Sequence, residues 1–446
     1  MSEGPLSDQR LLTVEEALSA VLEATPGPAG AEAVPVEAAL GRVIAREVRS
    51  STALPPWDNS AMDGYALRSV DTVSSTEEAP VRLRVIGEVA AGSAPEVAVE
   101  PGMAVRIATG AQVPPGADAV VPVEQTTPLD ARGMAAGPRG REAAGPLPDG
   151  CLVHVVVPQG MSIRRRGSDL SDGAVILEPG RVVGPAEIAL AAGSGVGELR
   201  VYRRPHVAVM ATGDEVRAPG EPLGPAGVPD ANGPGLRALV AAAGAVPVSL
   251  GIAADRLEDA VTRLRGVLDD VDACVVSGGV SVGPYDVVRS AFAELGSVGL
   301  WRVAIQPGKP FAFGLADRPG RPPVLLFGLP GNPVSSFVTF ELFVRPALRR
   351  LAGRGDLGRQ TDRAVLAEPV TKGAGRRAFL RVVAARSADG SVLRDELGRV
   401  PVRLAGGQGS HVMSALAVAD ALAIVPEDVD RLPTGAETAL WWLDRA

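Results

Sequence analysis

Three loops in the second half of the sequence combine glycine or proline with acidic, amide or hydroxyl side chains. Each follows an apolar segment that we expect to be a buried strand. The three loops are Thr212–Glu215, Ser277–Gly283 and Pro330–Pro333, after the strand-like segments 206–211, 271–276 and 323–329. In open α/β sheets, ligands bind beyond the carboxyl ends of the strands. We therefore expect the three loops to meet at one edge of a sheet and to form a ligand site.

The composition of these loops indicates which ligand the site would bind. Glycine-rich turns that lead into helices are typical anion sites, because backbone N–H groups can approach the anion and the helix N-terminus adds partial positive charge. Glu215, Asp255 and Asp286 are expected at the same edge, where their carboxylates would repel a phosphate. The pattern therefore predicts Mg²⁺, held by these three carboxylates and by phosphate oxygens of the ligand. Two alternatives stay open: Asp255 and Asp286 can be helix N-caps, and Glu215 can be a solvated loop residue.

A second polar group lies in the first half of the sequence, among short Val-rich segments. The compact stretch 58–65 (DNSAMDGY) follows a Pro-Pro-Trp turn, and Thr109 ends the strand-like segment 103–110. Arg164–Arg166 adds three contiguous positive charges. Thr109 could donate to an anion, and Arg164–Arg166 could clamp a phosphate. The alternatives are an Asx-rich turn at 58–65 and a solvated basic turn at 164–166.

The spacing of apolar residues divides the sequence into regions of different character. Residues 13–23 predict a helix that Thr13 caps, with Glu16 completing a capping box, and residues 36–50 form a second amphipathic segment. Residues 55–160 predict short strands, with an exposed flexible loop at 129–150. Strands that alternate with helices over 206–351 predict a parallel sheet covered on both faces, and short strands return after residue 360.

We therefore expect a multidomain α/β plus β fold with a doubly wound α/β domain. The expected domains are an N-terminal α/β domain (1–54 with 161–200), an inserted β domain (55–160), an α/β domain (201–355) and a C-terminal β domain (356–446).

Composition excludes several functional classes. The net charge is −8 and the longest basic run has three residues, which argues against a nucleic-acid surface. Two cysteines and three scattered histidines form neither a disulfide framework nor a zinc site. We find no signal-peptide pattern and no apolar stretch of about 18 residues. The sequence predicts a soluble cytoplasmic protein without membrane contact.

Taken together, the segments resemble one family, the molybdopterin molybdenumtransferases (MoeA and the E domain of gephyrin). The segments occur in the family's order and span residues 10–440. They are PWDNSAMDGYA (56–66), RIATGA (106–111), RRRGSD (164–169), ATGDEV (211–216), SGGVSVG (277–283), QPGKPFAFG (306–314) and LPGNPVSSF (329–337).

The resemblance implies an elongated protomer of four domains with a small C-terminal β-barrel, and a homodimer. Its active cleft would lie between the α/β domain of one subunit and the inserted domain of the other. The implied chemistry is Mg²⁺-dependent loss of AMP from adenylyl-molybdopterin, with transfer of molybdate to the dithiolene. Transient contacts with molybdopterin adenylyltransferase and with apo-molybdoenzymes are also expected.

The family's motifs can be carried over residue by residue. The expected catalytic residues are Asp63, Thr109, Glu215, Asp255 and Asp286, of which the last three would hold Mg²⁺. The expected substrate-binding residues are Ser277, Gly278, Gly279, Ser281, Lys309, Pro330, Gly331, Asn332, Pro333, Arg376 and Ser410.

The sequence departs from the family at a few positions. Many relatives have lysines where this chain has Arg302 and Gln306, so the neutral Gln306 weakens or moves one anion contact. The 129–150 insertion has no assignable counterpart.

Two rival functions remain. A molybdopterin adenylyltransferase uses the same SGG loop but normally needs only the α/β domain, so the inserted domain argues against it. A non-catalytic scaffold would not need the intact acidic set.

Overall fold

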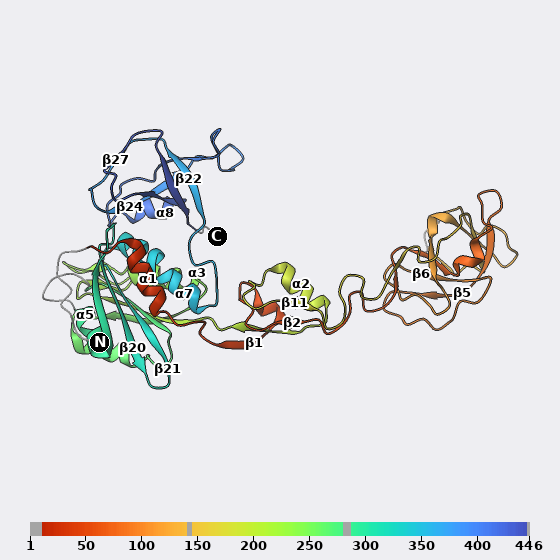
Figure 1. Ribbon diagram of the computed structural model, residues 1–446, viewed down its shortest axis with the longest axis horizontal. Coiled ribbons are helices and arrows are strands. Elements are labelled where there is room, and N and C mark those ends of the chain that lie inside the picture. The colour runs from red at the N-terminus through yellow and green to blue at the C-terminus, as the bar shows by residue number, and fades with distance from the viewer. Residues whose placement is uncertain (1–10, 141–144, 280–286, 444–446) are drawn as a thin grey trace.

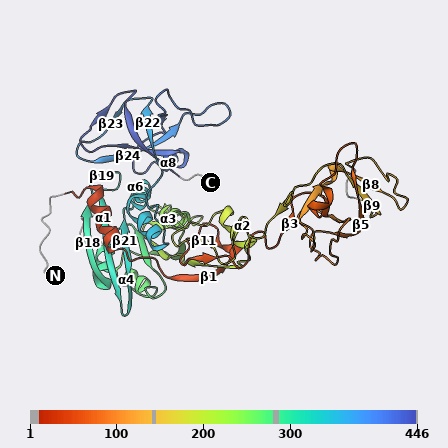
Figure 2. The same cartoon turned by 45° about the vertical axis from the view of Figure 1, so that its right-hand side comes forward.

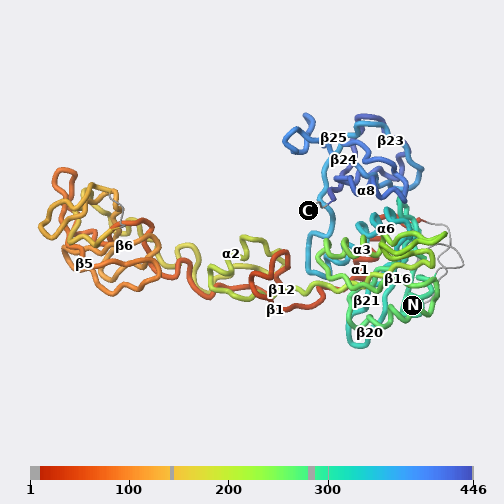
Figure 3. Tube along the Cα trace, turned by 180° about the vertical axis from the view of Figure 1, so that it is seen from behind, coloured from red at the N-terminus to blue at the C-terminus, as the bar shows by residue number. Residues whose placement is uncertain are grey.

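The computed structural model describes residues 11–140, 145–279 and 287–443. The molecule is elongated: an α/β unit lies beside the C-terminal β unit, and a long arm formed by residues 31–202 extends away from both (Figure 1). The chain enters and leaves the arm through two neighbouring strands, since β1 (Ala31–Pro35) pairs antiparallel with β12 (Glu198–Tyr202). The view from behind shows the same arrangement (Figure 3).

The α/β unit is built on a six-stranded sheet. Its order is β16-β13-β17-β21-β20-β18. The first four strands are parallel, whereas β20 and β18 are antiparallel. The expectation of a wholly parallel sheet is therefore wrong at this edge. The strands are β13 (His206–Thr212), β16 (Val246–Ala253), β17 (Ala273–Ser277), β18 (Gly296–Arg302), β20 (Pro310–Arg318) and β21 (Arg321–Leu329).

Helices cover both faces of this sheet, as the alternation along β13 requires. Val207 and Val209 belong to the core on one face, and Ala208 and Met210 belong to the core on the other. The first face is covered by α1 (Val14–Ala24), α3 (Asn232–Ala242), α6 (Pro333–Thr339), the π-helical turn η4 (Phe340–Val344) and α7 (Arg345–Leu351), and the second by α4 (Leu257–Arg265) and α5 (Val287–Leu295).

Two of these helical segments show how local sequence sets structure. The capping box that begins α1 is confirmed, because Glu16 N donates to Thr13 Oγ1 (3.1 Å) and Thr13 N donates to Glu16 Oε2 (2.9 Å). The helix predicted over 334–351 contains the π-helical turn η4, which ends two residues before Pro346. Proline has no N–H to continue the regular ladder, which accounts for the irregular turn.

The part of the arm nearest the α/β unit is a small α/β layer. The amphipathic segment 36–50 contains a short 3₁₀ turn and two short extended pieces and no α-helix, and Gly41 (φ +74°) lies in the turn that follows the 3₁₀ residues. Val36, Ile44 and Val48 then pack in a core with Leu199 and neighbouring residues. Its elements are η1 (Val36–Ala39), β2 (Val48–Arg49), β11 (Val175–Leu177) and α2 (Pro185–Gly193).

The far end of the arm is a six-stranded β unit in the order β7-β4-β6-β5-β9-β8. The insertion at 129–150 connects β8 to β9, and Arg139 attaches it to Glu77 and Gln125. The elements here are β3 (Asn59–Ser60), β4 (Gly64–Leu67), η2 (Ser69–Thr72), β5 (Val81–Val89), β6 (Met103–Ile107), β7 (Ala119–Pro122), η3 (Val123–Gln125), β8 (Thr126–Leu129), β9 (Gly150–Val153) and β10 (Ile163–Arg164).

The C-terminal unit is a small closed β-barrel, since β24 pairs with both β25 and β26 and so closes the sheet. The short strand β19 (Ile305–Gln306) of the α/β unit also pairs with β24, which joins the two units.

The remaining elements are β14 (Val216–Arg217) and β15 (Val228–Pro229) of the α/β unit, together with those of the C-terminal unit. The latter are β22 (Thr361–Leu366), β23 (Val370–Thr371), β24 (Arg377–Ala384), β25 (Val400–Leu404), α8 (Met413–Val418), β26 (Ala421–Val425), β27 (Arg431–Leu432) and β28 (Glu437–Trp442). Among the described residues, no helix combines the length and apolar character needed to cross a membrane.

Candidate active site

A pocket of about 710 Å³ lies beyond the carboxyl ends of the parallel strands. The three predicted loops meet there, together with one segment of the C-terminal unit. The lining residues include Thr212, Gly213, Glu215, Asp230, Asn232, Asp255, Ser277, Gly278, Gly279, Gly331, Asn332, Pro333, His411 and Met413. Many residues proposed from the sequence therefore share one cavity.

The glycine loop after β17 has a backbone that other residues would not adopt easily. Gly278 and Gly279 have φ values of +104° and +60°. A Cβ at Gly278 would lie 2.6 Å from Thr212 Oγ1 and 2.7 Å from Thr212 O. Glycine at 278 thus allows the loop to pass close to β13 and leaves its backbone facing the pocket.

Asn232 holds two of the loops together, although the sequence did not single it out. Its Nδ2 donates to Ser277 Oγ (2.6 Å) and to Gly331 O (2.7 Å). Ser277 and Ser336 in turn donate to the carbonyl of Pro330. The one sequence feature that could have indicated this role of Asn232 is its position at the start of α3, shortly after a strand.

The acidic side of the pocket contains Glu215 and Asp255, with Asp214 beside them. Asp214 N faces Asp255 Oδ2 (3.4 Å), and Asp255 N donates to Asp214 Oδ1 (3.1 Å). Partial burial, followed by the charges of Asp214 and Glu215, raises the pKa of Asp255 above its usual value. Asp255 does not cap α4, whose N-cap is Arg256. The helix-cap alternative is therefore wrong for Asp255.

These carboxylates suit a hard cation only together with other ligands. No group of three or more metal-binding side chains occurs among residues 11–140, 145–279 and 287–443. The predicted third ligand, Asp286, and the predicted Ser281 lie outside the described residues. Mg²⁺ is commonly held by one or two carboxylates plus waters and substrate phosphates, so Glu215 and Asp255 fit such a site.

Asp63 and Thr109 are brought together, but far from this pocket. Thr109 N donates to Asp63 Oδ1 (2.6 Å), and both residues are exposed. Asp58 accepts from Arg165 Nη1 and Arg166 N, each at 2.7 Å, which fixes the motif and lowers the pKa of Asp58, with the Arg166 bond as the largest cause. The segments that contain these residues, 58–65, 103–110 and 164–166, lie in the arm. Figure 2 shows that the β unit of the arm is at the opposite end of the molecule from the α/β unit that contains the pocket.

The expected substrate residues of the C-terminal half lie around the junction of β19, α6 and the barrel. Val334 N donates to Ser410 O (3.2 Å), next to the pocket-lining His411. Gln306 and Arg376 flank Gly373, where a Cβ would lie 3.8 Å from Gln306 Oε1 and 3.1 Å from Arg376 Nη2. Lys309 is half-buried just after β19. Lys309 and Arg376 are not among the residues that line the pocket.

Three family profiles match consecutive parts of the chain. They are the MoeA N-terminal region (domain I and II) over residues 12–195, a probable molybdopterin binding domain over 208–350, and the MoeA C-terminal region (domain IV) over 363–442.

Similar proteins extend over almost the whole chain. Molybdopterin molybdenumtransferase 2 of Mycobacterium tuberculosis is 37% identical over 92% of this chain and 94% of its own length. The molybdopterin molybdenumtransferase of Haemophilus influenzae is 32% identical over 95% and 97%. A crystal structure of the molybdopterin biosynthesis MoeA protein from Pyrococcus horikoshii matches with a TM-score of 0.76 and 31% identity, covering 97% of this chain and 99% of that one.

These matches define a multidomain transferase of molybdenum cofactor biosynthesis and confirm the expected fold class. The chain belongs to the MoeA family, the molybdopterin molybdenumtransferases.

Proposed function

We propose that the chain transfers molybdate into the dithiolene of adenylyl-molybdopterin, with Mg²⁺-dependent release of AMP. The observation that carries this proposal is the pocket of about 710 Å³, which joins glycine loops of positive φ to the carboxylates of Glu215 and Asp255. This combination suits an anionic ligand bound together with a divalent cation.

The residues of the pocket would divide the work between them. The backbone at Gly278 and Gly279 can approach a phosphate closely, and Asn232 keeps this loop beside Gly331. Glu215 and Asp255 would hold Mg²⁺. Partial burial, and then the nearby charges of Asp214 and Glu215, raise the pKa of Asp255, and the cation would offset the repulsion between these carboxylates. When bound, Mg²⁺ would neutralise charge on the departing AMP.

We further propose that the site is completed by a second copy of the chain. Asp63 and Thr109 lie next to β4 and β6 in the far unit of the arm, and Figures 1 and 2 show this unit far from the α/β unit whose loops line the pocket. In a two-fold homodimer, the end of one arm can reach the pocket of the partner, and the reverse contact follows by symmetry. Asp63 and Thr109 would then act on substrate held by the other α/β unit.

The direct test is an assay of AMP. The purified protein is incubated with adenylyl-molybdopterin, molybdate and Mg²⁺, and AMP is measured by chromatography. We expect AMP release only when both molybdate and the divalent cation are present. Equal release in excess chelator would contradict the role of the cation, and equal release without molybdate would contradict coupling to metal transfer.

A further inference from the structure

Two short segments connect the arm to the α/β unit, residues 26–30 (PGPAG) on the way out and 203–205 (RRP) on the way back. Gly30 has φ +99°. Such short, glycine- and proline-containing connections make few regular backbone hydrogen bonds. A backbone hydrogen bond from Ala29 N to Leu351 O (2.8 Å) holds the outgoing segment to the α/β unit, and the side chains that fasten both segments add to it in setting the direction of the arm.

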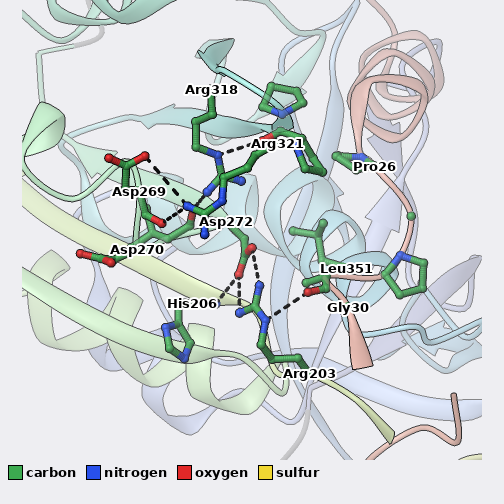
Figure 4. Close-up of a pocket in the computed structure, with 16 residues that line it drawn as sticks. Pro26, Gly30, Arg203, His206, Asp269, Asp270, Asp272, Arg318, Arg321 and Leu351 are labelled. Carbon is green, nitrogen blue, oxygen red and sulfur yellow. Dashed lines mark hydrogen bonds and ion pairs between the residues drawn. The ribbon is translucent and has the colours of Figure 1, made fainter. Parts of the chain in front are cut away.

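Arg203 fastens both segments at once. Its backbone N donates to Gly30 O (2.8 Å) and its Nε donates to Ala29 O (3.1 Å). Its Nη1 and Nη2 donate to the two carboxylate oxygens of Asp272, at 3.0 and 2.7 Å. Figure 4 shows the guanidinium of Arg203 facing the carboxylate of Asp272 at the wall of a cavity of about 870 Å³.

Asp272 links this contact to the sheet. Its Oδ2 also accepts from the backbone N of His206, at 2.8 Å. His206 begins β13, and Asp272 directly precedes β17. The ion pair thus joins the two connecting segments to the N-terminal ends of two central strands.

The ion pair is built to be stronger than an ordinary surface pair. The Asp272 side chain is 11% exposed and that of Arg203 is 34% exposed. Two parallel charge-assisted hydrogen bonds add direction as well as energy, whereas exposed single contacts contribute little.

The other contacts across this junction are of a different kind. Ala29 N donates to Leu351 O (2.8 Å), and Arg354 Nη1 donates to Gly41 O over a long 3.4 Å. The ring of Tyr202 lies over Gly353, where a Cβ would be 2.1 Å from the ring. These contacts are uncharged or involve one charge only.

We propose that the Arg203–Asp272 ion pair fixes the direction in which the arm leaves the α/β unit, and thereby positions Asp63 and Thr109 for the transfer reaction. The second half of this statement rests on the proposed function. Arg203 and Asp272 lie at the opposite ends of the strands from the active-site pocket and do not line it. They are therefore positioning residues.

The first test measures the direction of the arm without using activity. Both native cysteines are fully buried, so spin labels can be placed at Val73→Cys on the arm and Glu294→Cys on α5, both exposed positions. Subunit exchange with excess unlabelled protein leaves only distances within one chain. We expect Arg203→Gln and Asp272→Asn each to broaden the distance distribution, and the double variant to broaden it no further, because the pair acts as a unit.

The control is Arg204→Gln, which changes the neighbouring exposed arginine and should leave the distribution unchanged. Unchanged distributions in both single variants would overturn the proposal. If either single variant fails to fold, Arg203→Lys takes over the test. Lysine keeps the positive charge but lacks the planar guanidinium that donates two parallel hydrogen bonds. A broader distance distribution in this variant supports the proposal, and an unchanged distribution overturns it.

The second test separates positioning from general damage. We expect kcat for AMP release to fall by roughly tenfold to a hundredfold, as for misplaced catalytic groups, while KM for adenylyl-molybdopterin changes little because the pocket is intact. Rises in KM without loss of kcat would contradict positioning. Broadened distances in a protein whose wild type releases no AMP would reject the proposed function and keep the role of the ion pair in the arm. Active wild-type protein with unchanged distances in the variants would reject the role of the ion pair and keep the proposed function.

Discussion

Glu215 is an exposed carboxylate at the end of β13, in a loop that packing does not require to be acidic. Because it is expected to contact the cation and substrate, Glu215→Gln should lower AMP release by at least about a hundredfold, while the melting temperature changes little. The matched control is Glu221→Gln, an exposed glutamate in the same loop region. A several-degree fall in melting temperature, with full activity of the folded protein, would instead show that Glu215 is structural.

Gln306 is a neutral residue beside Arg376, at the junction between β19 and the barrel. Its Oε1 is buried without a hydrogen-bond partner. A lysine at this position would add a positive charge, and salt weakens the attraction between such a charge and an anion in solution. Gln306→Lys should therefore steepen the salt dependence of molybdate affinity, measured by calorimetry at several ionic strengths. An identical slope in the variant would place residue 306 outside the anion site.

At the scale of residues, the sequence identified those whose type is constrained by the backbone or by charge. Gly278 and Gly279 were proposed from the glycine-rich loop and the family motif, and their positive φ values favour glycine. Asn232 was missed because its role depends on two loops that come from distant parts of the chain. The resemblance implied that Asp63 and Glu215 of one chain belong to different clefts. The spacing of residues alone could not show this, because it depends on the direction of the arm.

At the scale of elements, strong periodicity predicted the helices and parallel strands of the α/β unit well. The antiparallel strands β18 and β20 were not predicted, because glycines interrupt their patterns. In the structure those glycines permit close pairing, since a Cβ at Gly314 would lie 2.2 Å from Ser297 O. Segment 36–50 has amphipathic spacing, yet it forms only a 3₁₀ turn and short extended pieces, from which Val36, Ile44 and Val48 pack around Leu199.

The barrel offers a prediction about pH. Hydrogen bonds, first from Arg394, lower the pKa of Asp362 to about 2, and this side chain also accepts from Trp442 Nε1 (3.3 Å). An aspartate in an unfolded chain has a pKa of about 3.9. Because the folded pKa is the lower one, Asp362 stabilises the fold above about pH 4, and this contribution is lost as the pH falls toward 2.

Asp362→Asn should therefore lower the melting temperature at pH 7 by a few degrees, and the difference from the wild type should shrink as the pH is lowered. Calorimetric scans at a series of pH values would measure this. Asp317→Asn, at an exposed position of β20, is the control. A difference that is the same at every pH would mean that Asp362 stabilises the barrel through shape rather than charge.

At the scale of the whole molecule, the arm separates two sets of proposed catalytic residues that the proposed reaction needs in one site. Asp63 directly precedes β4 and Thr109 follows β6, in the β unit at the far end of the arm, whereas Glu215 and Asp255 follow β13 and β16 of the α/β unit. Figure 1 shows the two units far apart. If two chains form the site, each homodimeric variant, Asp63→Ala or Glu215→Ala, should be inactive. A heterodimer of the two variants has one pocket that combines a wild-type Asp63 with a wild-type Glu215.

The most direct measurement is therefore AMP release by that heterodimer, isolated by two different affinity tags after co-expression. The account predicts activity near half that of the wild type, because one of the two sites is intact. Thermal melts of both homodimers establish that the variants fold. Heterodimer activity no higher than that of either inactive homodimer would contradict a site built by two chains.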